Sequence, residues 1–252
     1  MSAKDLTIDY LLTLGDNALI LGQRLCEWCG HAPIIEQDIA LSNIALDLIG
    51  EARNIYTYAA QLAGNGQNED TMAFLREEWQ YKNLLIVEQP NGNWADTIAR
   101  QFYFDAFHYS LYSQLQHSND DTIAAIAEKS LKEITYHLRF SAEWVIRLGD
   151  GTEESSKKMQ DAIDRLWVYT GEMFIPSEIE LKAAQAGIGI DPSTLLQEWN
   201  SRVIDVLLEA TLKVPTSIPY QKGGKVGNHS EHMGYILSDM QYMQRTYPHL
   251  EW

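Results

Sequence analysis

The strongest constraint on the fold is the placement of proline, because proline disrupts the interior of a helix and of a central strand. The 252-residue chain has seven prolines, and none lies between residues 91 and 175. Apolar residues in that stretch recur at intervals of three and four, as in Phe104, Phe107, Leu111 and Leu115. This is the period of a helix with one buried face, whereas a half-buried strand alternates every second residue. The sequence therefore predicts long helices.

Turns rich in glycine, aspartate and proline separate the periodic segments and indicate where the helices end. Long helices are expected at 5–29, 36–63, 70–88, 93–117 and 121–148, and shorter ones at 153–174, 176–186, 192–213 and 230–246. Residues 214–229 are expected to form an extended loop. No repeat of about 20–50 residues and no low-complexity linker divides the chain. We expect one all-α domain over residues 1–252, built as a four-helix bundle with additional C-terminal helices.

The charge balance excludes one broad class of function. Thirty-five acidic residues against nineteen basic ones give a formal charge of −16. Proteins that bind nucleic acid or anionic lipid use clustered Lys and Arg, so this chain is expected to bind neither. There is no run of about 18 uncharged apolar residues to cross a membrane. The N-terminal MSAKDLTIDYLLTLGDN lacks the pattern of a secretory signal, and we expect a cytoplasmic protein.

The two cysteines, Cys26 and Cys29, form a Cys-x-x-Cys pair. Such a pair serves as a redox couple or as half of a zinc site. No second cysteine pair exists to complete a Cys₄ site, and His31 adds at most a third ligand. We expect two reduced cysteines packed at the end of a helix, where a free cysteine behaves as a small hydrophobe.

One helical segment, LKEITYHLRF at residues 131–140, carries Glu133 and His137 four residues apart. Bundles that hold two iron ions use a Glu from each of two helices and a Glu-x-x-His from each of the other two. Residues three or four apart lie on one helix face, so both side chains can point inward. The preceding helix carries Asp105 and His108 at a spacing of three. These four residues are the candidates for a distorted metal site.

The second long helix offers no imidazole to such a site. Its best candidate acid is Asp47, and three residues later stands Gly50, which has no side chain to offer. Asp16 and Glu27 on the first helix belong to no recognisable pair. We therefore expect a metal-free bundle with vestigial candidates, namely Asp47, Asp105, His108, Glu133 and His137.

Without metal, buried polar side chains need other partners. Each one left unsatisfied costs about 1–3 kcal/mol. We therefore expect His108 and His137 to contact acids or tyrosines, such as Tyr109 or Tyr136.

Two patterns near the C-terminus resemble binding sites in part. His229, Glu231 and His232 give two imidazoles, whereas a closed zinc site needs four ligands, so an interface or capping role is expected. The glycine-rich loop at 222–227 has two lysines but lacks the order of a phosphate-binding loop. We expect that loop to clamp a neighbouring subunit.

Large aromatic side chains bury the most apolar surface, and tryptophan also has a polar N–H that needs a partner. Trp94, Trp144 and Trp167 occur in helical segments and are expected mainly in the core. The terminal Trp252 is expected to dock on a partner.

Ten short stretches, in order over nearly the whole chain, together resemble a known family. They are 14–17 (LGDN), 27–33 (EWCGHAP), 43–54 (NIALDLIGEARN), 87–92 (VEQPNG), 95–101 (ADTIARQ), 136–141 (YHLRFS), 147–152 (RLGDGT), 223–227 (GGKVG), 229–232 (HSEH) and 240–245 (MQYMQR). The chain resembles the C subunits of ring-1,2-phenylacetyl-CoA epoxidases, which are bacterial multicomponent oxygenases of aerobic phenylacetate catabolism. A match of this extent is far more specific than any single motif.

The resemblance implies a ferritin-like fold and a structural, non-catalytic role. In this family the related A subunit carries the di-iron centre and activates O₂, while the C subunit pairs with it and stabilises it. A reductase subunit with FAD and an iron–sulfur cluster supplies electrons from NADPH, and the complex epoxidises the ring of phenylacetyl-CoA. The resemblance thus implies no catalytic residue, metal or other cofactor in this chain, in agreement with Gly50.

The resemblance also implies where phenylacetyl-CoA is approached. Two segments are implied: Gln80, Tyr81, Lys82 and Asn83, and then Leu181, Lys182 and Ala183. Lys82 and Lys182 would offer ammonium groups to phosphate, and Tyr81 a stacking face. The alternative is that these are ordinary solvent-exposed helix residues.

Three functions stay open at this point. A non-catalytic epoxidase subunit predicts no stoichiometric iron in the isolated chain. An independent di-iron oxidase or iron-binding protein with a distorted site predicts about two irons per chain, lost in His137→Ala. A thiol-dependent regulator requires loss of function when Cys26 and Cys29 are both replaced by Ser.

Overall fold

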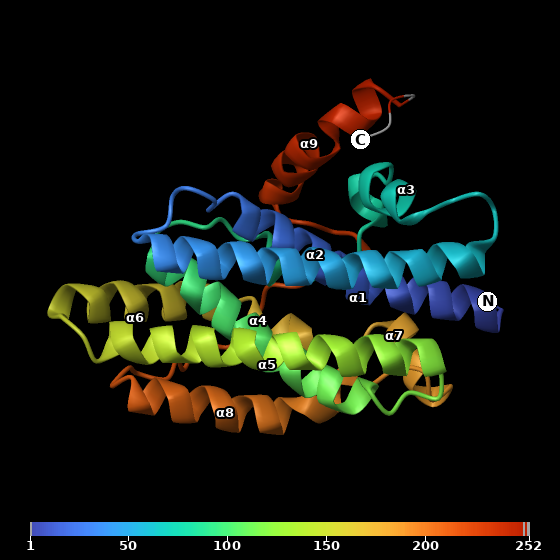
Figure 1. The fold of residues 1–252 in the computed structure, drawn as a ribbon. Coiled ribbons are helices and arrows are strands. Elements are labelled where there is room, and N and C mark those ends of the chain that lie inside the picture. The colour runs from blue at the N-terminus through green and yellow to red at the C-terminus, as the bar shows by residue number, and fades with distance from the viewer. Residues whose placement is uncertain (1, 249, 251–252) are drawn as a thin grey trace. The chain divides into compact units, whose positions relative to one another are not determined.

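The computed structural model describes residues 2–248 and residue 250. Its regular elements are helices, and no strand occurs among the described residues. The backbone falls into two compact units, one made of the described residues of Met1–Glu88 and Gly223–Trp252, the other of Gln89–Lys222. We call them unit 1 and unit 2 (Figure 1). The expectation of a single domain over 1–252 stays a prediction.

Unit 1 is built on two long helices, α1 (Ala3–Cys26) and α2 (Ile35–Ala63), which lie side by side in opposite directions (Figure 1). Ser2 and Asp5 form a capping box that starts α1. Gly64, in the left-handed region with φ 66°, ends α2. A line of fully buried side chains joins the two helices, including Leu21, Leu41, Ile44 and Ile55.

The predicted helix 70–88 is wrong. The structure has the short helix α3 (Glu69–Phe74) and two 3-10 turns, η1 (Glu78–Gln80) and η2 (Leu85–Glu88). Apolar spacing in this segment resembled that of a helix. Side chains of α1 instead accept the backbone N–H groups of Lys82 and Leu84, so the chain crosses α1 in an extended form.

The tail of the chain returns to unit 1 through the 3-10 turn η5 (Gly224–Val226) and α9 (Glu231–Thr246). Ser230 caps α9 by accepting the N–H of His232. Within the unit, α9 contacts α1, α3 and both 3-10 turns of the crossing segment. The tail therefore closes over the segment that replaced the predicted helix.

Unit 2 is centred on α4 (Trp94–Leu115), which packs against α5 (Asp121–Gly149), α6 (Glu153–Trp167) and α8 (Leu196–Glu209). Three shorter elements complete the unit: η3 (Thr170–Phe174), α7 (Glu178–Gln185) and η4 (Pro192–Leu195). Most of α4 is buried on every side, whereas α5 has one buried stripe. The four longest helices have 24, 29, 22 and 29 residues, which confirms the predicted lengths.

Aromatic rings form much of the core of unit 2. Tyr103, Trp167 and Trp199 lie with their ring centroids 5.8 Å apart, and the Trp199 indole N–H donates to the Tyr103 carbonyl. Trp94 and Trp144 meet edge to face at 5.4 Å. The three predicted core tryptophans thus contact other aromatic rings, although each stays half-buried. Trp252 lies outside the described residues.

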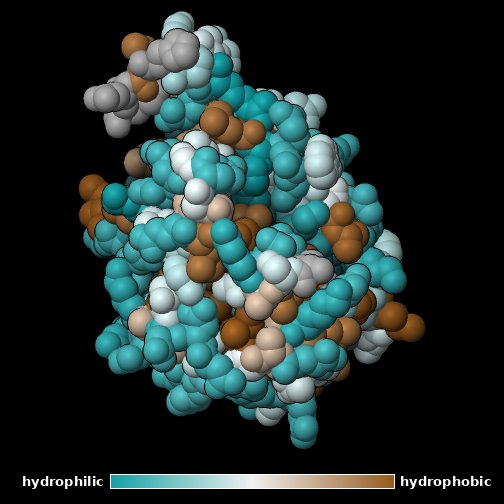
Figure 2. Space-filling model, turned by 90° about the vertical axis from the view of Figure 1, so that its right-hand side faces the viewer, coloured by the Kyte–Doolittle hydropathy of each residue, from teal (hydrophilic) through white to brown (hydrophobic). Residues whose placement is uncertain are grey.

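The exposed surface is of an ordinary kind on the face shown in Figure 2, where hydrophilic residues predominate and hydrophobic ones form small groups. Cys26 is the last residue of α1, three residues before the predicted end at 29, and both Cys26 and Cys29 are free and exposed. The expected packing of the two thiols was wrong, because the chain leaves α1 through an open turn.

Candidate functional site

The implied substrate segment, residues 80–83, is held in place by α1. The backbone N–H of Lys82 donates to Asp16 Oδ2 at 2.7 Å, and that of Leu84 donates to Asn17 Oδ1 at 2.8 Å. Asp16 and Asn17 belong to LGDN, the first of the ten stretches that carry the family resemblance. This stretch thus fixes the backbone of the segment.

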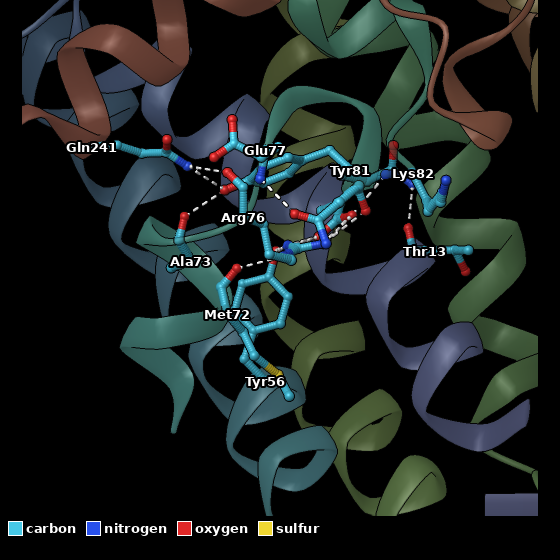
Figure 3. Close-up of polar contacts among 12 residues, drawn as sticks. Thr13, Tyr56, Met72, Ala73, Arg76, Glu77, Tyr81, Lys82 and Gln241 are labelled. Carbon is cyan, nitrogen blue, oxygen red and sulfur yellow. Dashed lines mark hydrogen bonds and ion pairs between the residues drawn. The ribbon is translucent and has the colours of Figure 1, made fainter. Parts of the chain in front are cut away.

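Asp16 is the centre of a buried polar cluster. Its carboxylate accepts the Tyr56 hydroxyl at 2.5 Å and the Arg76 guanidinium through both terminal nitrogens. The guanidinium also donates to the Tyr56 oxygen at 3.0 Å and lies over the Tyr81 ring, 4.1 Å from its centroid. Figure 3 shows Arg76 between the two tyrosines. Burial, followed by the negative charge of Asp16, holds the pKa of Tyr56 well above its usual value.

Tyr81 is fully buried inside this cluster. Its hydroxyl donates to the Ala73 carbonyl at 2.5 Å and accepts from Gln241 of α9 at 2.9 Å. Burial raises the pKa of Tyr81 to about 12, against the opposing charge of Arg76. The ring implied as a stacking face is therefore covered in the structure by the chain's own guanidinium and by α9.

The other three residues of the segment differ in exposure. Asn83 is buried and donates to Glu88 Oε1 at 2.9 Å. Gln80 is half-buried, and its amide oxygen accepts the N–H of Glu77. Lys82 is half-buried, with its ammonium 3.2 Å from the Trp79 carbonyl. Within this segment, Lys82 alone combines a positive charge with partial exposure.

A second buried hub, Glu88, ties the segment to the tail. Glu88 Oε1 accepts from Asn83 and lies 2.6 Å from His229 Nδ1, while Oε2 accepts both the N–H and the hydroxyl of Ser230. Arg24 donates to the Glu88 carbonyl from two nitrogens, at 3.0 and 2.8 Å. The HSEH stretch, residues 229–232, thus caps α9 and anchors it to Glu88. Capping was one of the two roles predicted for this stretch.

His229 faces acceptors on both sides, because its Nε2 lies 3.0 Å from the Tyr81 carbonyl. An imidazole that donates from both nitrogens is the protonated, positively charged form. Burial alone would lower the pKa of His229, but the hydrogen bond and charge of Glu88 outweigh burial and raise it. Glu88 and His229 therefore form a buried ion pair.

The glycine loop packs on the same segment of its own chain. A Cβ placed on Gly224 would stand 2.1 Å from the Asn83 carbonyl oxygen, and one on Gly227 would stand 2.2 Å from that of Trp79. Gly227 also has φ 84°, which favours glycine. The glycines are thus required for close approach within unit 1. Clamping of a neighbouring subunit by this loop stays a prediction.

The second implied segment lies on α7 in unit 2. Leu181 is exposed and Ala183 is fully buried. Lys182 forms an ion pair with Glu178 one turn earlier, at 2.5 Å. This pair is the ordinary stabilisation of a helix surface.

Among the candidate metal residues of unit 2, Asp105 is held by hydrogen bonds from two neighbouring polar side chains. Asp105 is fully buried, and its two carboxylate oxygens accept from Gln101 and Ser141, each at 2.7 Å. Burial raises its pKa to about 6, while the electrostatic interaction with His137 and the hydrogen bonds from Ser141 and Gln101 oppose that rise. His108 and His137 are both buried, so both lie on the buried sides of their helices.

The predicted contacts of the two histidines are confirmed in kind. The His108 ring meets Tyr112 edge to face at 4.3 Å, and Asp105 interacts electrostatically with both imidazoles. Tyr109, which was the expected neighbour, packs under Arg202 instead. Tyr136 meets His137 at a centroid distance of 6.3 Å.

Comparison with known proteins decides the family. The model of the phenylacetic acid catabolic protein family matches residues 2–252. The C subunit of 1,2-phenylacetyl-CoA epoxidase from Escherichia coli K12 is 54% identical over 96% of this chain and 98% of its own length. The chain belongs to the phenylacetic acid catabolic protein family. The A subunit of the same E. coli enzyme is 25% identical over 60% of this chain and 48% of its own length.

Membership of the phenylacetic acid catabolic protein family confirms the predicted ferritin-like, all-α fold and the resemblance on which it rested. In the described part of the chain, no helix is both long enough and apolar enough to cross a membrane.

The inward-facing residues of α2 that could serve as metal ligands differ from those that the sequence predicted. Along the described length of α2 the buried acid is Glu51, and Asn54 follows it at the spacing where a di-iron protein has histidine. Asp47 is half-buried, and a Cβ added to Gly50 meets no atom within 4 Å. The sequence placed the inward pair at Asp47 and Gly50, which is corrected to Glu51 and Asn54. Asp47 and Glu51 are one helical turn apart on the same side of α2, so apolar spacing alone does not show which of them is buried.

The residues present do not fit a di-iron centre. Position 54 offers an amide in place of the imidazole, and both oxygens of Asp105 accept protein donors. Glu133 is half-buried, unlike His137 on the same helix. Among the described residues, no three His, Cys, Asp or Glu side chains are grouped to hold a metal ion.

Sequence reasoning missed Tyr56, Arg76 and Glu88 as buried polar residues. Their signal was weak, because the charged partners of these side chains, Asp16 and His229, lie 40 or more residues away in the sequence. Asp16, noted only as an isolated acid, proved to be the centre of the unit 1 cluster.

Proposed function

We propose that this chain is a structural, non-catalytic subunit of a multicomponent phenylacetyl-CoA epoxidase, which pairs with and stabilises a di-iron A subunit. In the proposed complex the iron belongs to the A subunit. NADPH, FAD and an iron–sulfur cluster belong to the reductase. This chain contributes a rigid helical partner and takes no part in the chemical step.

The observation that carries the proposal is the donor set around Asp105. The carboxylate that occupies a position suited to a metal ligand is instead bound by Gln101 and Ser141. Neutral amide and hydroxyl donors satisfy a buried carboxylate without a metal ion. Support also comes from the 54% identity to the E. coli C subunit over almost the full length of both chains.

Participation in substrate binding is a narrower proposal. Burial of Tyr81, Asn83 and Ala183 leaves Lys82 and Lys182 as the residues able to reach a phosphate of CoA. The two lysines differ, because Lys182 is already paired with Glu178. We expect Lys82→Ala to raise the KM of the assembled epoxidase for phenylacetyl-CoA more than Lys182→Ala, with kcat unchanged.

The proposed function is tested by measuring iron and activity together. The chain is purified alone and with its A subunit, iron is determined by plasma mass spectrometry, and NADPH-dependent oxidation of phenylacetyl-CoA is assayed with the reductase. We expect sub-stoichiometric iron in the isolated chain, and activity only when the A subunit is present.

The competing function, an independent di-iron protein, makes the opposite forecast. It requires about two irons in the isolated chain, lost in His137→Ala and retained in the control His117→Ala, which changes an exposed histidine. That result, or epoxidation by the isolated chain, would overturn the proposal.

A further inference from the structure

The pair formed by Cys26 and Cys29 has no part in the proposed function. Both thiols are free and exposed, so molecules in solution can reach them. Cys26 is the last residue of α1, and Cys29 lies three residues later in the turn that leaves the helix. Whether two accessible thiols at this spacing can join depends on the shape of that turn.

The backbone of the turn brings the two cysteines close together. The N–H of Cys29 donates to the Cys26 carbonyl at 3.1 Å, and the N–H of Trp28 donates in the same way to the Leu25 carbonyl at 3.0 Å. The first and last Cα atoms of such a four-residue turn lie within about 7 Å of each other. Disulfide-bonded cysteines have Cα atoms about 4.4–6.8 Å apart. Residues 26–29 therefore have the span that a disulfide bond requires.

The turn is tied on both sides to the rest of unit 1. Before it, Arg24 donates to the Glu88 carbonyl from two nitrogens, at 3.0 and 2.8 Å. After it, the N–H groups of Gly30 and Ala32 donate to Asp38 Oδ2, at 2.8 and 3.3 Å. Two reacting groups that are already held near each other react within the molecule in preference to a second molecule. Closure within the chain is therefore expected to outcompete attack by an external thiol.

The surroundings of Cys26 disfavour its thiolate. Partial burial, followed by Cys29 and the charge of Glu27, raises the pKa of the Cys26 thiol. The pair also lies at the C-terminal end of α1, where the helix dipole is negative. Strongly oxidising cysteine pairs are those whose reduced form is stabilised as a thiolate. Since that stabilisation is lacking at Cys26, a disulfide at this site should resist reduction once it has formed.

We propose that Cys26 and Cys29 are a thiol–disulfide exchange site, which forms a reversible intrachain disulfide by reaction with small-molecule disulfides. The inference does not depend on the proposed function. The Cys29 thiolate attacks one sulfur of the small molecule, a mixed S–S bond forms, and the other half leaves as a thiolate. The Cys26 thiolate then attacks the Cys29 sulfur, and the second half leaves. The chain loses two protons and two electrons, and the small-molecule disulfide is reduced to two thiols.

The test uses the full chain, which has no other cysteine. Wild type, Cys26→Ser and Cys29→Ser are incubated with glutathione and its disulfide at about 1 mM each. Free thiols are then blocked with iodoacetamide, and the intact mass is measured. We expect the wild type to lose two hydrogens, to carry no alkyl group and to carry no glutathione. Each single variant should instead retain one glutathione, because it has no second thiol to displace it.

Three results would overturn the inference. The wild type could keep both thiols open to alkylation, which would show that the disulfide does not form. It could retain glutathione as the single variants do, which would show that the turn does not bring the thiols together. Disulfide-linked dimers on a non-reducing gel would show that the thiols pair between molecules instead.

Thermal unfolding, followed by circular dichroism, checks the fit of the bond to the turn. The oxidised wild type is expected to unfold at a higher temperature than the reduced wild type, because the bond restricts the unfolded chain. Cys29→Ser, treated in the same two ways and freed of glutathione, is the control and should show no difference. A lower midpoint of the oxidised wild type would mean that the turn must distort to close, against the geometry on which the inference rests.

Discussion

His229 and Glu88, 141 residues apart in the sequence, form a buried ion pair with Nδ1 2.6 Å from Oε1. The pair joins the residue before the cap of α9 to the last residue of η2. Glu88 and Asp16 both hydrogen-bond to the segment 80–83, Glu88 through the Asn83 amide and Asp16 through the backbone N–H of Lys82.

The ion pair predicts a pH dependence of stability. Because the pKa of His229 is raised, its contribution is fully present below the ordinary value of 6.5 and is lost as pH rises through the folded-state value. His229→Ala is expected to cost about 3 kcal/mol near pH 6, and less as the pH rises above 6.5. Urea denaturation across this range measures the cost. His232→Ala, three residues away, is the control, and an equal cost of His229→Ala at every pH would contradict the prediction.

The Asp16 cluster predicts a large effect of removing one charge. Asp16→Asn leaves the Arg76 guanidinium, whose side chain is 11% exposed, without its counter-charge. We expect a loss of about 3–5 kcal/mol in the free energy of unfolding. Glu143→Gln, which alters an ion pair on the exposed face of α5, should change stability by less than about 0.5 kcal/mol. Similar losses in the two variants would show that the cluster has no special role.

Replacing the Asp105 carboxylate is expected to raise the stability of the protein, whereas replacing that of Asp16 lowers it. The folded-state pKa of Asp105, about 6, exceeds the ordinary 3.8, so stability falls as pH rises between these values and the cost persists above them. Asp105→Asn should therefore gain about 1–3 kcal/mol at neutral pH and little near pH 4. Chemical denaturation at the two pH values checks this, with the exposed Asp161→Asn as the control. Destabilisation at neutral pH would indicate that the charged carboxylate is required.

Two glycine substitutions of the same chemistry should act in opposite directions. Gly50→Ala fills open space on α2 and should stabilise the isolated chain by about 1 kcal/mol. Gly15→Ala should destabilise it by about 1–3 kcal/mol, because the added Cβ would stand 2.6 Å from the Tyr56 ring. Thermal denaturation of both variants measures the difference. A destabilising Gly50→Ala would mean that Gly50 is already in close contact.

The long helices were predictable because their apolar periodicity is local. Helix α5 begins at Asp121 and ends at Gly149, within one residue of the expected 121–148, since both its buried stripe and its end signals lie in consecutive residues. The family was predictable for a similar reason, because short stretches such as 43–54 consist of consecutive residues and can be recognised before the fold is known.

The crossing segment was not predictable in this way. Residues 70–88 have helical spacing, yet Asp16 and Asn17, more than sixty residues away, accept the backbone donors that a helix would have used. The side chain of Tyr81 was expected at a ligand and lies instead beneath Arg76 and α9.

By itself, the sequence determined that the chain is helical, where its long helices run and to which family it belongs, because periodicity, turn residues and short motifs act over neighbouring residues. Tertiary structure decided that Glu51 rather than Asp47 is buried, that Gly50 meets open space, and that His229 pairs with Glu88. Which face of a helix is covered, and which distant groups share a proton, depends on contacts between elements that no local pattern records.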